Sequence, residues 1–197
     1  MKQSLWASVL VLLLAACTHS PIAQEHSLFP QLGTPTDVEP SASATTTIVI
    51  DASTVPEAID RPRWVLMDAA GTARILASER RIEPLKLAIP RTIAYHIQRA
   101  LPDTFVRATS GAGSERADVQ LRIDVVAWEA VLGEYVRIAL VWHVDHANMR
   151  RLRRGSFLAP VDNPLHASLL LTQRTALARG SVRIANDVRD LLRKPPQ

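Results

Sequence analysis

The sequence predicts an α/β fold, a three-layer domain in which a mixed β-sheet with one long antiparallel hairpin packs against two main helices. Two patterns lead to this prediction. Apolar and polar residues alternate over 119–127 and again over 136–144, on either side of a turn at 132–134, as in a hairpin with one buried face. Apolar residues recur at helical spacing over 85–101 and again between about 164 and 192, as in helices that cover a sheet.

The elements before residue 85 are expected to be strands. Residues 46–50 are a β-branched run without polar alternates, which is typical of a buried strand. Prolines at both ends of 55–62 make that segment a rigid connection. Segments 64–67 and 72–76 flank a turn at 68–71, where Gly71 can adopt a positive φ, so they are expected to pair as a hairpin.

The first predicted helix has Pro84 in its first turn, where proline is favoured. Pro90 does not suit a helix interior, so we expect either a kink there or a helix that starts at that residue. A short strand at 104–107 follows the helix. The apolar stripe of the helix consists of Leu85, Ile89, Ile93, Ile97 and Leu101.

The C-terminal part is expected to hold a third strand near 156–159, after a basic turn at 150–154, and then the second helix. Asn163 and Pro164 are typical of an N-cap and a first helical residue. Gly180 either weakens the middle of this helix by about 1 kcal/mol relative to alanine, or it admits a close neighbour.

Residues 1–16 have the pattern of an export signal, with the positive charge of Lys2 and an apolar run over 5–15 that is too short to span a bilayer. The Leu-Ala-Ala-Cys ending at 14–17 resembles the bacterial lipobox, in which the cysteine thiol receives a diacylglyceryl group and becomes the new N-terminus. Cys17 is the only cysteine, so we predict lipidation at Cys17 and no internal disulfide. The alternative is an ordinary secretory signal with an incidental cysteine.

Three segments are expected in the chain: the signal peptide at 1–16, the lipidated cysteine with a flexible Pro-rich tether at 17–44, and a single domain at 45–197. As a coil, the tether has a root-mean-square reach of about 30 Å. Thr18 follows the cysteine, where an aspartate is associated with retention in the inner membrane of enteric bacteria. By resemblance to that sorting rule, we expect a lipid-anchored protein in the outer membrane that faces the periplasm.

The formal net charge of +4 and the pI of about 9.8 describe a basic protein. Because export removes the chain from nucleic acid, we expect anionic lipid head groups or an acidic protein partner instead. The candidate contact residues are Arg150, Arg151, Arg153 and Arg154. The alternative for this basic run is a solvated hairpin tip.

No catalytic constellation is visible in the sequence. The stretch at 110–114 lacks both the Gly-x-Ser-x-Gly elbow and a P-loop lysine, so a flexible loop is expected there. His143, Asp145 and His146 have the composition of a metal site, but they need a further ligand from elsewhere, and a polar strand end is the alternative. We therefore predict no enzyme activity, no cofactor and no metal.

Two motifs and their surroundings resemble a known family. Asp60-Arg61-Pro62 leads into a strand, 81–85 (Arg-Ile-Glu-Pro-Leu) opens a helix, and a later hairpin carries Trp128. With the lipobox and tether, this order resembles the ABC-type transport auxiliary lipoprotein family, whose best-known member belongs to the paraquat-inducible transport system. The resemblance covers most of 45–192. At the place of the family's tyrosine-containing first strand, this chain has Ser-Leu-Phe at 27–29.

The resemblance implies a three-layer α/β domain on an outer-membrane lipoprotein. It also implies partners, namely an MCE-type transport protein and an inner-membrane complex that together move lipids across the envelope, and assembly into a homo-oligomeric ring. Two other functions stay open at this point. One is a structural or outer-membrane-assembly lipoprotein that is not linked to a transporter, and the other is a periplasmic hydrolase or metal protein.

Overall fold

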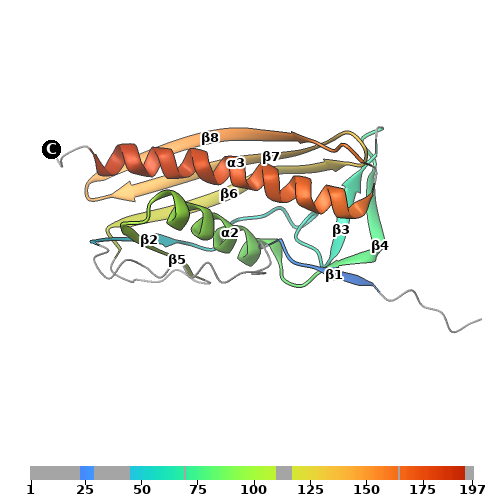
Figure 1. Ribbon diagram of the computed structural model, residues 1–197, viewed down its shortest axis with the longest axis horizontal. Coiled ribbons are helices and arrows are strands. Elements are labelled where there is room, and N and C mark those ends of the chain that lie inside the picture. Colours follow the sequence, from blue (N-terminus) through green and yellow to red (C-terminus); the bar gives the residue numbers. More distant parts are fainter. Residues whose placement is uncertain (1–22, 29–44, 69, 110–116, 164, 194–197) are drawn as a thin grey trace, which may run out of the picture.

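A computed structural model describes residues 23–28, 45–68, 70–109, 117–163 and 165–193. Within these residues, eight strands form one sheet, and two long helices lie across it (Figure 1). The strands are β1 (Gln24–His26), β2 (Thr46–Ile50), β3 (Arg63–Met67), β4 (Ala73–Arg81), β5 (Thr104–Ala108), β6 (Val119–Val131), β7 (Tyr135–His146) and β8 (Met149–Pro160). The helices are α2 (Leu85–Ala100) and α3 (His166–Leu192).

Strand β6 is the centre of the sheet. One of its edges pairs antiparallel with β7, which in turn pairs antiparallel with β8. Its other edge is shared, because β2 lies parallel to the start of β6 at Val119 and β3 lies beside its last residue, Val131. Beyond β2 lies the parallel strand β5, and beyond β3 lie first the antiparallel β4 and then β1.

The predicted α/β class, with its mixed sheet, long antiparallel hairpin and two packing helices, is confirmed. Both helices belong to the same layer, since they contact each other and share one hydrophobic core with one face of the strands. Helix α3 lies on β7 and β8, and α2 lies beside β5. The described residues therefore form two layers, a sheet and a helix layer, where three layers were predicted, because no described helix covers the opposite face of β6, β7 and β8.

The two predicted hairpin turns are present. Gly71 and Gly133 have φ values of 79° and 77°, a conformation that glycine adopts without strain. The β6–β7 hairpin contains a register shift between Val125 and Ala127, a β-bulge within an otherwise continuous ladder.

The prediction of a basic turn at 150–154 is wrong. Strand β8 begins at Met149, and the turn before it consists of Ala147, with φ 51°, and Asn148. The basic run lies inside the strand, which pairs with β7 from Met149 to Pro160. An edge strand with much of its surface in water does not need an apolar alternation, so the sequence pattern of a strand is weak here.

Helix α2 starts at Leu85 and contains Pro90 in its interior. Proline has no N–H for the carbonyl four residues earlier, which belongs to Lys86. That carbonyl instead accepts a hydrogen bond of 3.2 Å from the backbone N–H of Ser53. The segment after β2 thus compensates for the bond that Pro90 removes.

Helix α3 starts at His166, two residues later than a cap at Asn163 would give. The Asn163 side chain instead accepts a hydrogen bond from the Leu165 N–H at 3.1 Å in the connection before the helix, and Pro164 lies outside the described residues. Of the two interpretations of Gly180, the close neighbour is correct: a Cβ there would lie 3.1 Å from the ring of Phe157.

The segment predicted as a tether contributes to the sheet. Gln24–His26 forms β1, parallel to the end of β4, and Leu28 is buried with 5% of its surface exposed. The boundary predicted at residue 45 is corrected accordingly, because residues 24–28 belong to the folded domain. Cys17 and Thr18 lie outside the described residues.

Candidate docking surface

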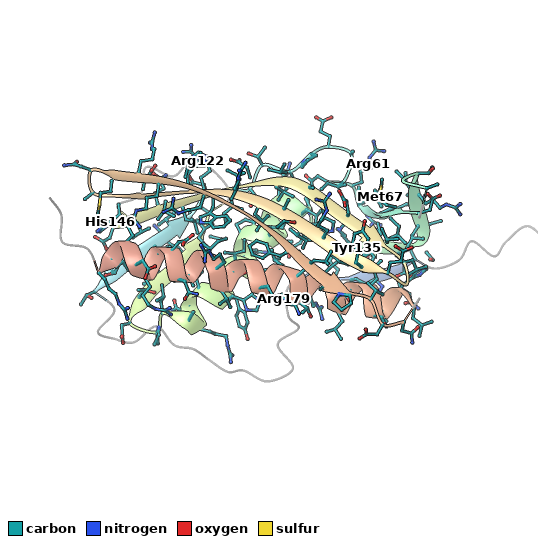
Figure 2. All side chains as sticks on the ribbon, turned by 90° about the horizontal axis from the view of Figure 1, so that it is seen from above. Arg61, Met67, Arg122, Tyr135, His146 and Arg179 are labelled. Atoms are coloured by element: carbon teal, nitrogen blue, oxygen red, sulfur yellow. The ribbon has the colours of Figure 1, made fainter. Side chains whose placement is uncertain are left out.

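The face of β6, β7 and β8 that points away from the helices carries most of the charged side chains of these strands, and we call it the open face. Figure 2 shows Arg122 on this side of the sheet, away from α3. Because side chains alternate along each strand and paired residues point to the same face, the register defines its members. They are Gln120, Arg122, Asp124, Glu129, Arg137, His143, Asp145, Arg150, Leu152, Arg154 and Leu158.

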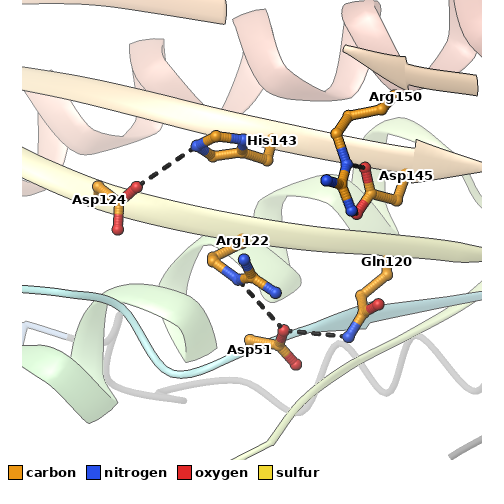
Figure 3. Close-up of polar contacts among 7 residues, drawn as sticks. All are labelled: Asp51, Gln120, Arg122, Asp124, His143, Asp145 and Arg150. Carbon is orange, nitrogen blue, oxygen red and sulfur yellow. Dashed lines mark hydrogen bonds and ion pairs between the residues drawn. The ribbon is translucent and has the colours of Figure 1, made fainter. Parts of the chain in front are cut away.

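Charges of opposite sign meet across the strands of the open face. Arg150 donates from Nε and Nη2 to the two carboxylate oxygens of Asp145, at 2.9 and 3.2 Å (Figure 3). The hydrogen bond with Asp145 raises the pKa of Arg150 above its usual value. Arg137 on β7 forms a similar pair with Glu129 on β6, and this pairing raises the pKa of Arg137 above its usual value.

A second group of polar contacts lies where β6 faces the segment after β2. The Asp51 carboxylate accepts a hydrogen bond from Gln120 Nε2 at 3.1 Å, and the same oxygen lies 3.8 Å from Arg122 Nε (Figure 3). The other Asp51 oxygen is buried and has no hydrogen-bond partner among the described residues. His143 Nε2 lies 3.7 Å from a carboxylate oxygen of Asp124.

The four candidate arginines lie on two different faces of β8. Arg150 and Arg154 pair with Asp145 and Val141 of β7 and lie on the open face. Arg151 and Arg153 pair with Val144 and Trp142, whose side chains are buried on the helix side. The structure therefore divides the predicted patch into two pairs, and Arg154 on the open face makes no hydrogen bond or ion pair with a described residue.

The predicted metal-like cluster is not assembled. Asp145 binds Arg150, His143 lies near Asp124, and His146 Nδ1 lies 2.8 Å from the backbone oxygen of Asp118. Across the described segments, no group of three or more histidine, cysteine, aspartate or glutamate residues has an arrangement that holds a metal ion. The stretch at 110–114 lies outside the described residues.

The two family-like motifs bind each other, which their spacing in the sequence did not reveal. Arg81 Nη1 donates to the backbone carbonyls of Ile59, Arg61 and Arg63 at 3.0–3.3 Å, and the Asp60 carboxylate accepts the N–H of Leu85 at 2.8 Å. We call this group the motif cluster. Asp60 thus caps the first residue of α2.

Burial governs the electrostatics of the motif cluster. Only 8% of the Arg81 surface is exposed, and desolvation lowers its pKa to about 10, against the opposing effect of Asp60. Its guanidinium carbon also lies 6.0 Å from the ring centre of Trp64. With its donors directed at backbone carbonyls, Arg81 fixes the chain path from the Asp-Arg-Pro turn into α2.

Glu79 connects three elements next to this cluster. One carboxylate oxygen lies 2.5 Å from His26 Nε2 on β1, and the other lies 3.0 Å from His166 Nδ1 at the start of α3. Burial raises the pKa of Glu79, but the hydrogen bonds from His166 and His26 outweigh it and leave the pKa below its usual value. The sequence offered no signal for this group, because the three residues are far apart in the chain.

The fold and the open face define a small α/β domain with an exposed, charged sheet face. None of its described helices has the length and apolar character that a membrane span requires. Residues 31–185 match the family of ABC-type transport auxiliary lipoprotein components, and the chain belongs to this family. The resemblance stated from the motifs is thereby confirmed.

Solved structures share the fold. An uncharacterized protein superposes with a TM-score of 0.68 at 15% identity, over 85% of this chain and 99% of that chain. Protein XCC0632 from Xanthomonas campestris, of family DUF330, superposes with a TM-score of 0.58 at 15% identity, over 84% of this chain and 90% of that one. No curated protein matches the chain.

Proposed function

We propose that the protein is an outer-membrane-anchored, periplasm-facing auxiliary lipoprotein of an intermembrane lipid transport system. Its task is to dock an MCE-type transport protein and the associated inner-membrane complex, without catalysing a reaction. The observation that carries this proposal is the family match over residues 31–185, which covers most of the domain. The lipidation of Cys17, the outer-membrane position that Thr18 favours and a homo-oligomeric ring belong to the proposal.

The open face is the surface on which we place the partner. It is a long stretch of sheet with no described helix over it, and it displays arginine, aspartate, glutamate and histidine together with the exposed Leu152 and Leu158. Interleaved charges of both signs specify a partner's orientation more than they add affinity. The ion pairs within the open face are accessible to solvent. Their rearrangement when a partner binds therefore costs little free energy.

The proposal is tested by capture of the transport partner from cells that express the complete system. The acylated chain is expected to recover the MCE-type protein, and the double variant Arg150→Glu with Arg154→Glu is expected to lose at least tenfold of that recovery. The matched control is Arg151→Glu with Arg153→Glu, which makes the same charge change on the other face of β8.

Three results would speak against the proposal or a part of it. Absence of capture by the unaltered chain rejects the transport function and favours a structural or assembly lipoprotein. Equal capture by both double variants rejects the open face as the docking surface. For the anchor, Cys17→Ala is expected to abolish the uptake of labelled palmitate, and palmitate uptake by that variant would reject lipidation at Cys17.

A further inference from the structure

The first described strand is firmly held by the domain. The three residues of β1 pair with the end of β4, and the carbonyl of His26 accepts the N–H of Ile82 at 3.0 Å. Arg174 of α3 donates from Nη2 to the carbonyl of Ser27 at 2.7 Å. Together with the buried Leu28 and the Glu79 contacts, these bonds fix the point at which the chain enters the fold.

This docking shortens the connection between the lipid anchor and the domain. Seven Cα–Cα steps separate Cys17 from Gln24 and span about 25 Å at most when fully extended. Without β1, the connection would run to Thr46 over a maximum of about 100 Å. The hairpin itself is about 40 Å long, judged from the length of β6. The connection is therefore shorter than the domain that it holds.

Several turns meet at the end of the domain where β1 lies. Met67 pairs with Val131, which brings the β3–β4 and β6–β7 turns together, and Val161 N–H donates to the Glu134 carbonyl at 2.9 Å. This hydrogen bond places the connection between β8 and α3 at the same end of the domain. We call this region, with β1, the anchor end. Figure 1 shows β1, β3 and β4 at one end of the molecule and the β7–β8 turn at the other.

Several elements that meet at the anchor end carry exposed apolar side chains. Leu132 lies in the β6–β7 turn, Leu165 directly precedes α3, and Leu171 lies in the first turns of that helix with 63% of its surface exposed. Ile75 on β4 is also exposed. Arg63, Arg74 and Arg80 of β3 and β4, the strands that lie at this end of the molecule in Figure 1, are exposed as well. Apolar side chains beside basic ones favour contact with a lipid head-group region.

We propose that the anchor end rests on the lipid surface that holds the acylated Cys17. The domain then stands on the membrane, and the β7–β8 turn points away from the membrane. The inference rests on the lipid anchor of the proposed function and adds an orientation to it. The short connection brings the anchor end to the membrane, and the exposed leucines make that contact favourable.

The orientation is tested with the purified, natively acylated chain in vesicles of phosphatidylethanolamine and phosphatidylglycerol. Because acylation occupies Cys17, a cysteine introduced elsewhere is the only free thiol for an environment-sensitive fluorophore. A label at Leu132→Cys is expected to be quenched at least threefold more by nitroxide-labelled head groups than a label at Asn148→Cys in the β7–β8 turn. Equal quenching, or stronger quenching at residue 148, overturns the proposal.

Three further measurements separate this proposal from the anchor itself and from contact between copies. Vesicle flotation reports the anchor: a chain that does not float with the vesicles rejects the lipid anchor, whereas a floating chain with an unquenched residue 132 rejects only the orientation. Leu28→Asp, with folding checked by circular dichroism, is expected to release β1 and lower the quenching at residue 132. The fluorophore at residue 132 is also compared with and without vesicles. If it is equally protected from solvent without them, contact between copies of the protein explains the protection, and the proposal is overturned.

Discussion

The motif cluster and the open face use the same kinds of side chains in opposite ways. In the cluster, the Arg81 guanidinium is buried and binds three backbone carbonyls of one turn. On the open face, the Arg150 side chain is 76% exposed and binds a single carboxylate. Burial, rather than residue type, therefore decides whether an arginine of this protein builds the fold or stays exposed on its surface.

The largest difference in stability between the two regions is expected when Arg81 and Arg150 are each replaced by alanine in separate variants. Arg81→Ala leaves three carbonyls of the turn without their donor, so we expect the free energy of unfolding to fall by about 3 kcal/mol. Arg150→Ala removes one exposed pair and is expected to change it by less than about 0.5 kcal/mol. Urea unfolding of both variants measures the difference. Similar losses would show that burial does not separate the two regions.

The two faces of β8 also differ in the volume that is available to an added side chain. Gly180→Val places a branched side chain against Phe157 and Leu140, so we expect a loss of about 1–3 kcal/mol in the free energy of unfolding. Ser156→Val adds a branched side chain to an exposed strand position, where it is expected to be nearly neutral. Thermal unfolding measures both. A neutral Gly180→Val would mean that the interface between α3 and the sheet is loosely packed.

The buried side also predicts a dependence of stability on pH, through Glu79. Because the folded pKa of Glu79 is below its unfolded value, its stabilising contribution is complete above about pH 4.5. That contribution is lost as the pH falls through the lowered folded pKa, when the carboxylate becomes protonated. Glu79→Gln is expected to reduce stability by about 1 kcal/mol at neutral pH and to flatten this part of the stability curve.

Acid titration of unfolding, with the unaltered chain as reference, measures this dependence on pH. An identical slope in both proteins would show that Glu79 does not hold β1 and α3 together through its charge.

The smallest effect is expected for the coupling between Asp145 and Arg150. A double-mutant cycle with alanine at both positions is expected to give about 0.2–1 kcal/mol, decreasing as salt is added, because the pair is exposed. Chemical unfolding at two salt concentrations measures it. A coupling above about 2 kcal/mol that ignores salt would place this pair among the structural contacts.

The sequence predicted those elements whose side chains repeat a pattern. The alternation in β6 and β7 predicted the hairpin, and the stripe of α2 predicted that helix in spite of Pro90. Strand β1 was missed because three polar residues among prolines carry no period, and its stability comes from contacts far away in the sequence. Local patterns do not encode contacts of this kind.

The candidate site was predicted in part. The basic run drew attention to the right strand, but its assignment to a turn concealed the division of the four arginines between two faces. The partners of the two family-like motifs also depended on tertiary structure. Asp60 and Leu85 are 25 residues apart, so no helix or turn period relates them.

The position of the basic run on β8 has a consequence for how copies of the protein behave together. Along this strand, one edge is paired with β7, and no described strand pairs with the other. A twelve-residue edge of this kind is a template for strand addition by another chain and hence for aggregation. Four arginines within five positions oppose this, since two such edges repel each other when they approach. The same charges that make β8 a candidate contact are therefore expected to oppose association between β8 edges, most strongly at low salt, where repulsion reaches furthest.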